Sequence, residues 1–114
     1  MLSDEFIEEL IHVIRSVSEE WAAAKARKTW LEEQKKVVLA RQMIFAAQNG
    51  SRSSASQERD AYASPEYSDL LVSIRHACNE EARLGRSIKE AEMRFEAWRT
   101  QSANEREERS RYKA

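Results

Sequence analysis

Residues 67–98, with the sequence YSDLLVSIRHACNEEARLGRSIKEAEMRFEAW, decide the fold of this chain. Ten positions of this stretch follow one another in steps of three and four, and nine of them are apolar. They are Tyr67, Leu70, Ile74, Ala77, Glu81, Leu84, Ile88, Ala91, Phe95 and Trp98. This spacing puts them on one narrow face of an α-helix, which is typical of a coiled-coil seam. We therefore expect this segment to pack lengthwise against a partner helix.

A second segment with the same periodicity lies closer to the N-terminus and supplies that partner. Its seam positions are Ile7, Leu10, Ile14, Val17, Trp21, Ala24, Lys28, Leu31, Lys35, Val38, Gln42 and Phe45. A second apolar stripe at helical spacing comprises Ala26, Trp30, Val37, Ala40, Ile44 and Ala47. Helix one is thus expected to carry apolar surface on two sides.

Local signals for helix ends divide the chain into two long helices. Ser3 is expected to cap helix one, Asn49-Gly50 to end it, and Ser64-Pro65-Glu66 to begin helix two. The prediction is one helical-hairpin domain over residues 1–114, with helix one at about 3–48, a turn at 49–64 and helix two at about 65–108. A short helical segment is expected within the turn, over residues 57–63, with Ser54 or Ser56 as its cap.

The composition favours an all-α fold. The chain of 114 residues has only two Gly and one Pro, and good helix formers dominate it. Charged residues make up 34% of the chain, yet the formal net charge is −1, so the two signs are interspersed. The single cysteine excludes an intrachain disulfide and a cysteine-based zinc site, which favours a reducing, cytoplasmic setting.

Two long helices joined by a short connection are expected to fold back as an antiparallel hairpin. Centring the turn near residue 56 predicts the contacts Phe45–Tyr67, Val38–Ile74, Trp21–Ala91, Val17–Phe95 and Ile14–Trp98. The same register places Glu81 near Lys28 and Lys35, where an ion pair would help to fix the register. Gly85 then falls near Trp30 or Lys28, and its missing side chain suggests that a bulky group approaches it closely.

A single hairpin leaves much of its apolar surface in water, so we expect a homodimer that forms a four-helix bundle. Five side chains outside the seams are the candidate interface: Trp30, Val37, Ile44, Leu71 and Cys78.

The sequence contains no recognisable catalytic or metal-binding motif. His12 and His76 lie far apart in the sequence, and neither has the spacing of a metal-binding pair. Cys78 has no suitably placed histidine, and no glycine-rich phosphate-binding loop occurs. We therefore expect no enzyme activity, no metal and no cofactor. No apolar run is long enough to span a bilayer, and no export signal is visible, so no membrane association is expected.

Nucleic-acid binding is the alternative function. Residues 21–41 carry six basic and two acidic side chains, and Trp30 lies among them. A basic segment with an aromatic residue can engage single strands. The candidate contacts are Lys25, Arg27, Lys28, Lys35, Lys36 and Arg41. Against this hypothesis, residues 1–20 carry six acids and only one Lys or Arg.

Residues 57–67 (QERDAYASPEY), 93–99 (MRFEAWR) and 103–106 (ANER) resemble small helical-hairpin proteins of tailed phages and prophages. The resemblance covers roughly residues 37–106. It implies a phage or prophage origin, with expression in the bacterial host cytoplasm and genes often near those of homologous recombination or single-strand binding. No activity and no functional residues are established for these proteins. The resemblance thus favours a non-enzymatic protein that acts through protein–protein contact, as an accessory to DNA recombination or replication.

Overall fold

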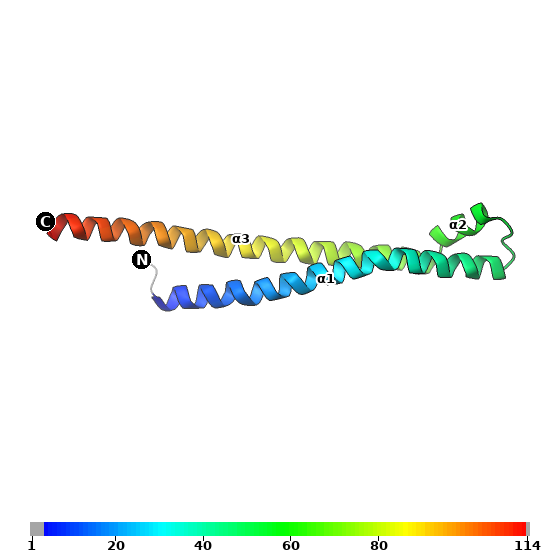
Figure 1. Cartoon of the computed structure of the whole chain (residues 1–114), viewed down its shortest axis with the longest axis horizontal. Coiled ribbons are helices and arrows are strands. Elements are labelled where there is room, and N and C mark those ends of the chain that lie inside the picture. Colours follow the sequence, from blue (N-terminus) through cyan, green and yellow to red (C-terminus); the bar gives the residue numbers. More distant parts are fainter. Residues whose placement is uncertain (1–3, 114) are drawn as a thin grey trace. The chain divides into compact units, whose positions relative to one another are not determined.

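The computed structural model describes residues 4–113, and over this range it consists of three α-helices without any β-strand. Helix α1 is Asp4–Gln48, α2 is Ser54–Tyr62 and α3 is Pro65–Lys113 (Figure 1). The all-α prediction and the two long helices are confirmed. Helix α3 continues five residues beyond its predicted end at residue 108. The predicted cap at Ser3 lies outside the described residues.

Asn49 and Gly50 end α1 as predicted. Gly50 has φ of +100°, a left-handed conformation that glycine adopts without steric cost. The Ser51 N–H donates to the carbonyl of Ala46, and the Gly50 N–H donates to that of Ala47. These two hydrogen bonds form a Schellman motif, which satisfies carbonyls that the end of a helix leaves without partners.

The connection contains a helix that is longer than predicted. Helix α2 begins at Ser54, and its cap is Ser53 rather than Ser54 or Ser56, because the Ser53 side chain accepts a hydrogen bond from the Ser56 N–H. Ser64 caps α3 as predicted, since its Oγ accepts from the Tyr67 N–H at 3.2 Å. The reversal of the chain is therefore confined to residues 49–53, and α2 follows the reversal.

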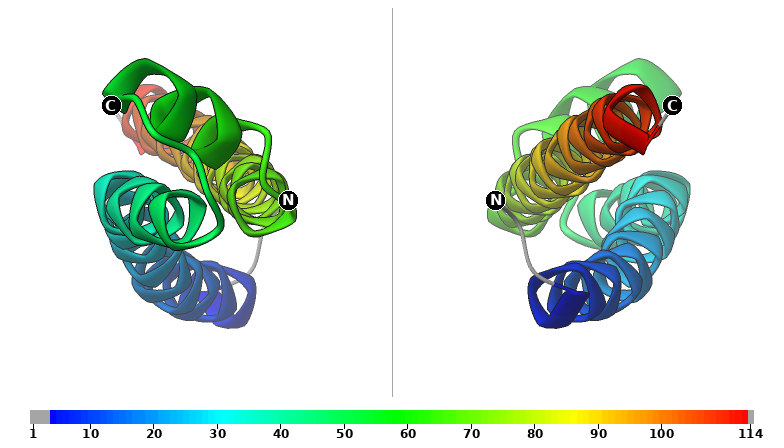
Figure 2. Two further views of the ribbon diagram at one scale, coloured as in Figure 1. Left: turned by 90° about the vertical axis from the view of Figure 1, so that its right-hand side faces the viewer. Right: turned by 90° about the vertical axis from the view of Figure 1, so that its left-hand side faces the viewer.

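The chain divides into two compact units. The first combines the described parts of residues 1–21 and 82–114, and the second is Ala22–Glu81. Within each unit a segment of α1 lies beside an antiparallel segment of α3, and α2 belongs to the second unit (Figure 2). The first unit has a core of Ile7, Leu10 and Ala91, on which Ile14, Phe95 and Trp98 pack. The second has a core of Leu31, Ile74 and Ala77.

The predicted seams are the faces that these units bury. None of the ten seam positions of residues 67–98 is exposed, and on α1 eleven of the twelve are buried or half-buried. The exception is Phe45, which is 59% exposed and therefore does not belong to the buried seam, and its contact with Tyr67 remains a prediction. Ala46 is buried instead, next to the point at which the chain reverses.

The predicted register is wrong by about one heptad. Ile74 packs with Leu31, seven residues before its predicted partner Val38. Ala91 packs with Ile7 and Leu10 and not with Trp21. The prediction centred the turn on residue 56 because it treated residues 49–64 as one symmetric connection. The real reversal at residues 49–53 lies closer to the N-terminus, which accounts for the shift of these contacts.

Gly85 lies against Trp21, and not against Trp30 or Lys28 as predicted. A Cβ atom added to Gly85 would stand 3.5 Å from Nε1 of Trp21, which is an ordinary van der Waals distance. The expectation of a bulky neighbour is confirmed, but its identity follows the corrected register. The missing side chain is not a steric requirement here.

Replacing each of the two glycines by alanine is therefore expected to have opposite effects on stability. Gly50→Ala is expected to destabilise the protein by about 1 kcal/mol, because alanine is strained at φ of +100°. Gly85→Ala is expected to stabilise it by up to about 1 kcal/mol, because alanine favours the helix and its methyl group only touches Trp21. Urea denaturation of both variants checks this pair. A destabilised Gly85→Ala variant would mean that the indole packs more tightly on this position.

Candidate interaction surface

Three large apolar side chains of α1 lie in water at intervals of seven residues. Trp30 is 58% exposed, Val37 is 47% exposed and Ile44 is 61% exposed. Since seven residues make almost two complete turns, the three side chains share one face of the helix. We call these three residues the α1 stripe. All three belong to the second compact unit, so their shared face does not depend on the placement of the other unit.

The α1 stripe is bordered by a pair of charges that links α1 to α3. Arg41 Nη1 lies 2.5 Å from Oε1 of Glu66. The other carboxylate oxygen of Glu66 accepts a hydrogen bond from Gln42 Nε2. Val37 and Ile44 are four residues before and three residues after Arg41, so they are its neighbours on the helix surface. The Arg41–Glu66 pair thus marks the flank of the α1–α3 contact on which the α1 stripe lies.

The other two candidate interface residues lie elsewhere. Leu71 is exposed, but it follows Glu66 by five residues, which turns it about 140° away on α3. Cys78 is half-buried and packs against the core of Leu31, Ile74 and Ala77. The five predicted residues therefore do not form one surface, and only the α1 stripe remains as a contiguous candidate.

The predicted ion pair of the seam is confirmed with Lys28. Lys28 Nζ lies 2.5 Å from Oε2 of Glu81, and both side chains are partly buried. The hydrogen bond to Glu81 raises the pKa of Lys28 above its usual 10.5, against the smaller opposing effect of partial burial. Lys35, the other predicted partner, is half-buried on the same face of α1.

This pair makes stability depend on pH in the alkaline range. Because the pKa of Lys28 is higher in the folded protein, its contribution is complete below pH 10.5 and is lost as pH rises through the folded-state pKa. We expect the difference in Tm between the wild-type protein and Glu81→Gln to be constant near neutral pH and to shrink above about pH 10.5. Thermal melts followed by circular dichroism check this. Lys89→Gln, at an exposed position of α3, is the control and should leave the profile unchanged.

The basic residues do not form one nucleic-acid-binding face. Lys28 and Arg41 pair with acids of α3, and Lys35 lies on the buried seam. Lys25, Arg27 and Lys36 are exposed, but helical geometry places only Lys25 and Lys36 on one face of α1 and turns Arg27 about 160–180° away from both. The Arg41–Glu66 ion pair could not be predicted from the sequence, because Glu66 lies opposite Arg41 only in the corrected register. Nucleic-acid contact by these six residues remains a prediction.

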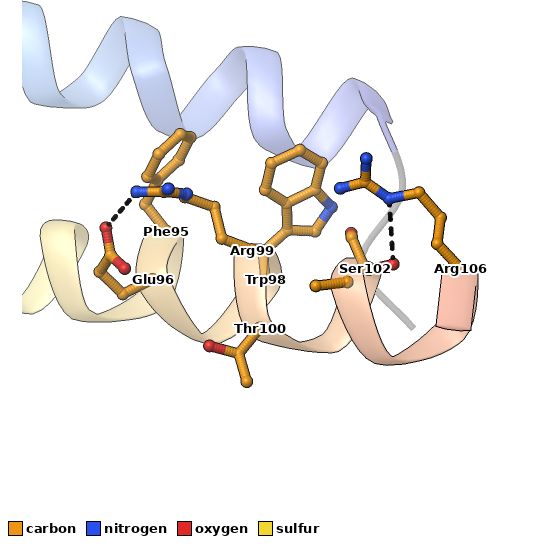
Figure 3. A pocket seen from close by; sticks show the side chains of 8 residues that line it. Phe95, Glu96, Trp98, Arg99, Thr100, Ser102 and Arg106 are labelled. Atoms are coloured by element: carbon orange, nitrogen blue, oxygen red, sulfur yellow. Dashed lines mark hydrogen bonds and ion pairs between the residues drawn. The ribbon is translucent and has the colours of Figure 1, made fainter. Parts of the chain in front are cut away.

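A hollow in the first unit holds no catalytic arrangement. Its walls come from α3 alone and include Phe95, Trp98, Arg99 and Arg106 (Figure 3). The rings of Phe95 and Trp98 lie 5.7 Å apart, Arg99 pairs with Glu96 at 3.0 Å, and Arg106 Nε donates to the Ser102 carbonyl. Both arginines are thus engaged in contacts along α3.

The described residues contain neither a metal-binding cluster nor a membrane-spanning helix. No group of three or more His, Cys, Asp or Glu side chains is placed there to hold a metal ion, and His12 and His76 are exposed. Within the same residues, no helix is long and apolar enough to cross a membrane.

Comparison with known proteins gives no match: no protein family, no curated protein and no solved structure is similar to this chain.

Proposed function

We propose that this protein is a non-enzymatic helical protein that self-associates and acts through protein–protein contact, with the α1 stripe as its contact surface. The observation that carries the proposal is the exposure of Trp30, Val37 and Ile44 on one face of α1. Complete burial of such a side chain contributes about 1.5–3 kcal/mol, so covering three of them supplies a driving force for association. Two copies would bring together four long helices, the number in the predicted four-helix bundle.

The wider role proposed here follows from the resemblance to phage helical-hairpin proteins. A protein of this kind would act in the host cytoplasm as an accessory to DNA recombination or replication. Its dimer would present α3 and the acidic first part of α1 to further protein partners. Direct nucleic-acid binding is the second candidate, but two of its six proposed basic residues already pair with acids of the same chain.

The experiment compares two valines that are similarly exposed. Val37 lies on the α1 stripe, and Val72, on α3, is 43% exposed. Light scattering coupled to size-exclusion chromatography is expected to find a dimer for the wild-type protein and for Val72→Glu. It should find a monomer for Val37→Glu, because a carboxylate in the apolar contact would lose its hydration. Circular dichroism verifies that both variants remain helical.

Two results would contradict the proposal. A wild-type protein that is monomeric at high micromolar concentration would show that the α1 stripe does not mediate self-association. Binding to labelled single-stranded DNA that weakens steeply with salt and is lost on Lys25→Glu/Lys36→Glu would favour the nucleic-acid alternative, since counterion release produces that salt dependence.

A further inference from the structure

A second coiled-coil seam runs along α1 through the α1 stripe. Eight exposed positions follow one another there in steps of three and four, and seven of them are apolar. They are Ala23, Ala26, Trp30, Glu33, Val37, Ala40, Ile44 and Ala47. Each follows a position of the first seam by two residues, so the second seam faces about 160° away from it. It therefore lies opposite α3, entirely within the second compact unit.

We propose that a second copy of the chain covers this seam, with the two α1 helices antiparallel and the two-fold axis near residue 35. This inference rests on the proposed function, because it assumes that the protein self-associates through the α1 stripe. It adds the direction, the register and the residues of the contact. Its basis is the order of large, small and charged residues along the second seam.

A parallel arrangement fits this order poorly. In a parallel pair in register, each seam residue meets its own copy. Trp30 would then lie against Trp30 of the partner subunit, and Glu33 would lie against Glu33 of the partner subunit. Two like charges in a shared apolar seam repel each other and have no cation at the same level. On the flank, Lys36 would also approach Arg41 of the partner subunit.

The antiparallel arrangement matches large residues with small ones. Centring the contact on residue 35 pairs Trp30 with Ala40 of the partner subunit, Ile44 with Ala26 of the partner subunit and Ala47 with Ala23 of the partner subunit. The small residues leave room for the indole and for the isoleucine side chain, which allows the helices to approach closely.

Charge complementarity favours the same register. Glu33, the only charged residue of the second seam, comes to lie beside Lys36 of the partner subunit. The symmetry repeats this pair on the other side of the axis, so each Lys36 next to the axis has a carboxylate within reach. A register shifted by one heptad would instead place Glu33 beside Met43 of the partner subunit, without a cation. Polar seam residues commonly select the register and direction of coiled coils in this way.

This contact determines how the helices of the second unit are ordered in the dimer. Since the second seam lies opposite α3, the helices form a row of α3, α1, α1 of the partner subunit and α3 of the partner subunit. The row differs from a four-helix bundle with one common core, because each α1 is covered on two faces and each α3 on one. Leu71, on α3, stays outside the contact.

The first test exchanges charges between the two subunits. Glu33→Lys and Lys36→Glu are each expected to dissociate at least about tenfold more readily than the wild-type dimer, because each homodimer then faces like charges. An equimolar mixture should form a heterodimer of wild-type affinity, which native mass spectrometry detects by mass. The control pair is Glu32→Lys and Lys25→Glu, both on the face that points about 100–160° away from the second seam. Their mixture should show no preference for the heterodimer.

The second test uses disulfide cross-linking and does not depend on charge. In a Cys78→Ser background, a mixture of Ala23→Cys and Ala47→Cys is expected to yield a cross-linked heterodimer. Ala23→Cys alone should not cross-link, because its two copies would lie about 36 Å apart along the helices, whereas a disulfide requires Cα atoms within about 7 Å.

The outcomes separate this inference from the proposed function. If Ala23→Cys cross-links with itself, or if the dimer shows neither the heterodimer preference nor the mixed cross-link, the antiparallel arrangement is overturned while self-association stands. If the wild-type protein is a monomer, both are overturned.

Discussion

Replacing Leu84 with alanine is expected to destabilise the protein by about 3 kcal/mol, within the usual range of 2–5 kcal/mol for leucine in a packed core. Leu84 is 3% exposed, the lowest value of any large side chain in the described cores. It lies on the first seam of α3, beside the position at which Trp21 packs over Gly85. The helices cannot collapse into the space that the smaller residue leaves, because the rigid indole holds them apart.

The matched control for Leu84→Ala is Leu71→Ala, on the same helix. Leu71 is 43% exposed, so its truncation is expected to cost less than about 1 kcal/mol. Urea denaturation at one fixed protein concentration measures both, since self-association would otherwise shift the apparent stability. Equal losses for the two variants would mean that the first seam is not the main source of stability.

The faces of the helices could be predicted from the sequence because they depend only on local spacing. A step of three or four residues fixes which side chains share a face, whatever the partner helix is. The signals for helix ends are local as well: Gly50 adopts the left-handed conformation that ends α1, and Ser64 caps α3. For this reason the burial of the seams follows the prediction closely, except at Phe45.

The register could not be predicted in the same way, because a shift of one heptad leaves the same residues on the seam. Leu31 and Val38 offer Ile74 nearly equivalent apolar partners, and only the position of the chain reversal distinguishes them. That position depends on α2, whose start at Ser54 required the cap at Ser53 to be recognised. Residues 51–56 are rich in serine, a composition that favours a turn over a helix.

The shared face of the α1 stripe could be predicted from the sequence, but its relation to Leu71 and Cys78 could not. The α1 stripe is a property of one helix, and its exposure follows once the first seam is buried. Grouping it with Leu71 and Cys78 required the relation between two helices, which depends on the register and on the flank that each residue occupies. Arg41 shows the same limit: its pairing with Glu66 is invisible until the two helices are aligned.

The double variant Lys28→Leu/Glu81→Leu, which removes both charges of the seam, is expected to have a Tm several degrees higher. It is also expected to let α3 pair with α1 in more than one register. The ion pair is partly buried at 2.5 Å, so its attraction is offset by the loss of hydration of both groups. Two leucines would extend the apolar seam without that penalty. Lys28→Leu alone is expected to lower Tm, because it leaves the carboxylate of Glu81, which is only 17% exposed, without its cation.

The alternative registers arise because the seam repeats every seven residues. In the wild-type protein, a shift of α3 by one heptad toward the N-terminus of α1 would place Glu81 near Val17, where the seam offers no cation. The double variant removes this penalty, so that the contact of Trp21 with Gly85 and the Arg41–Glu66 pair are left to select the register. An amide NMR spectrum of the double variant should therefore show more than one set of signals for the seam residues, whereas one set is expected for the wild-type protein. A double variant with a higher Tm and a single set of signals would show that these other contacts, together with the reversal at residues 49–53, select the register without the ion pair.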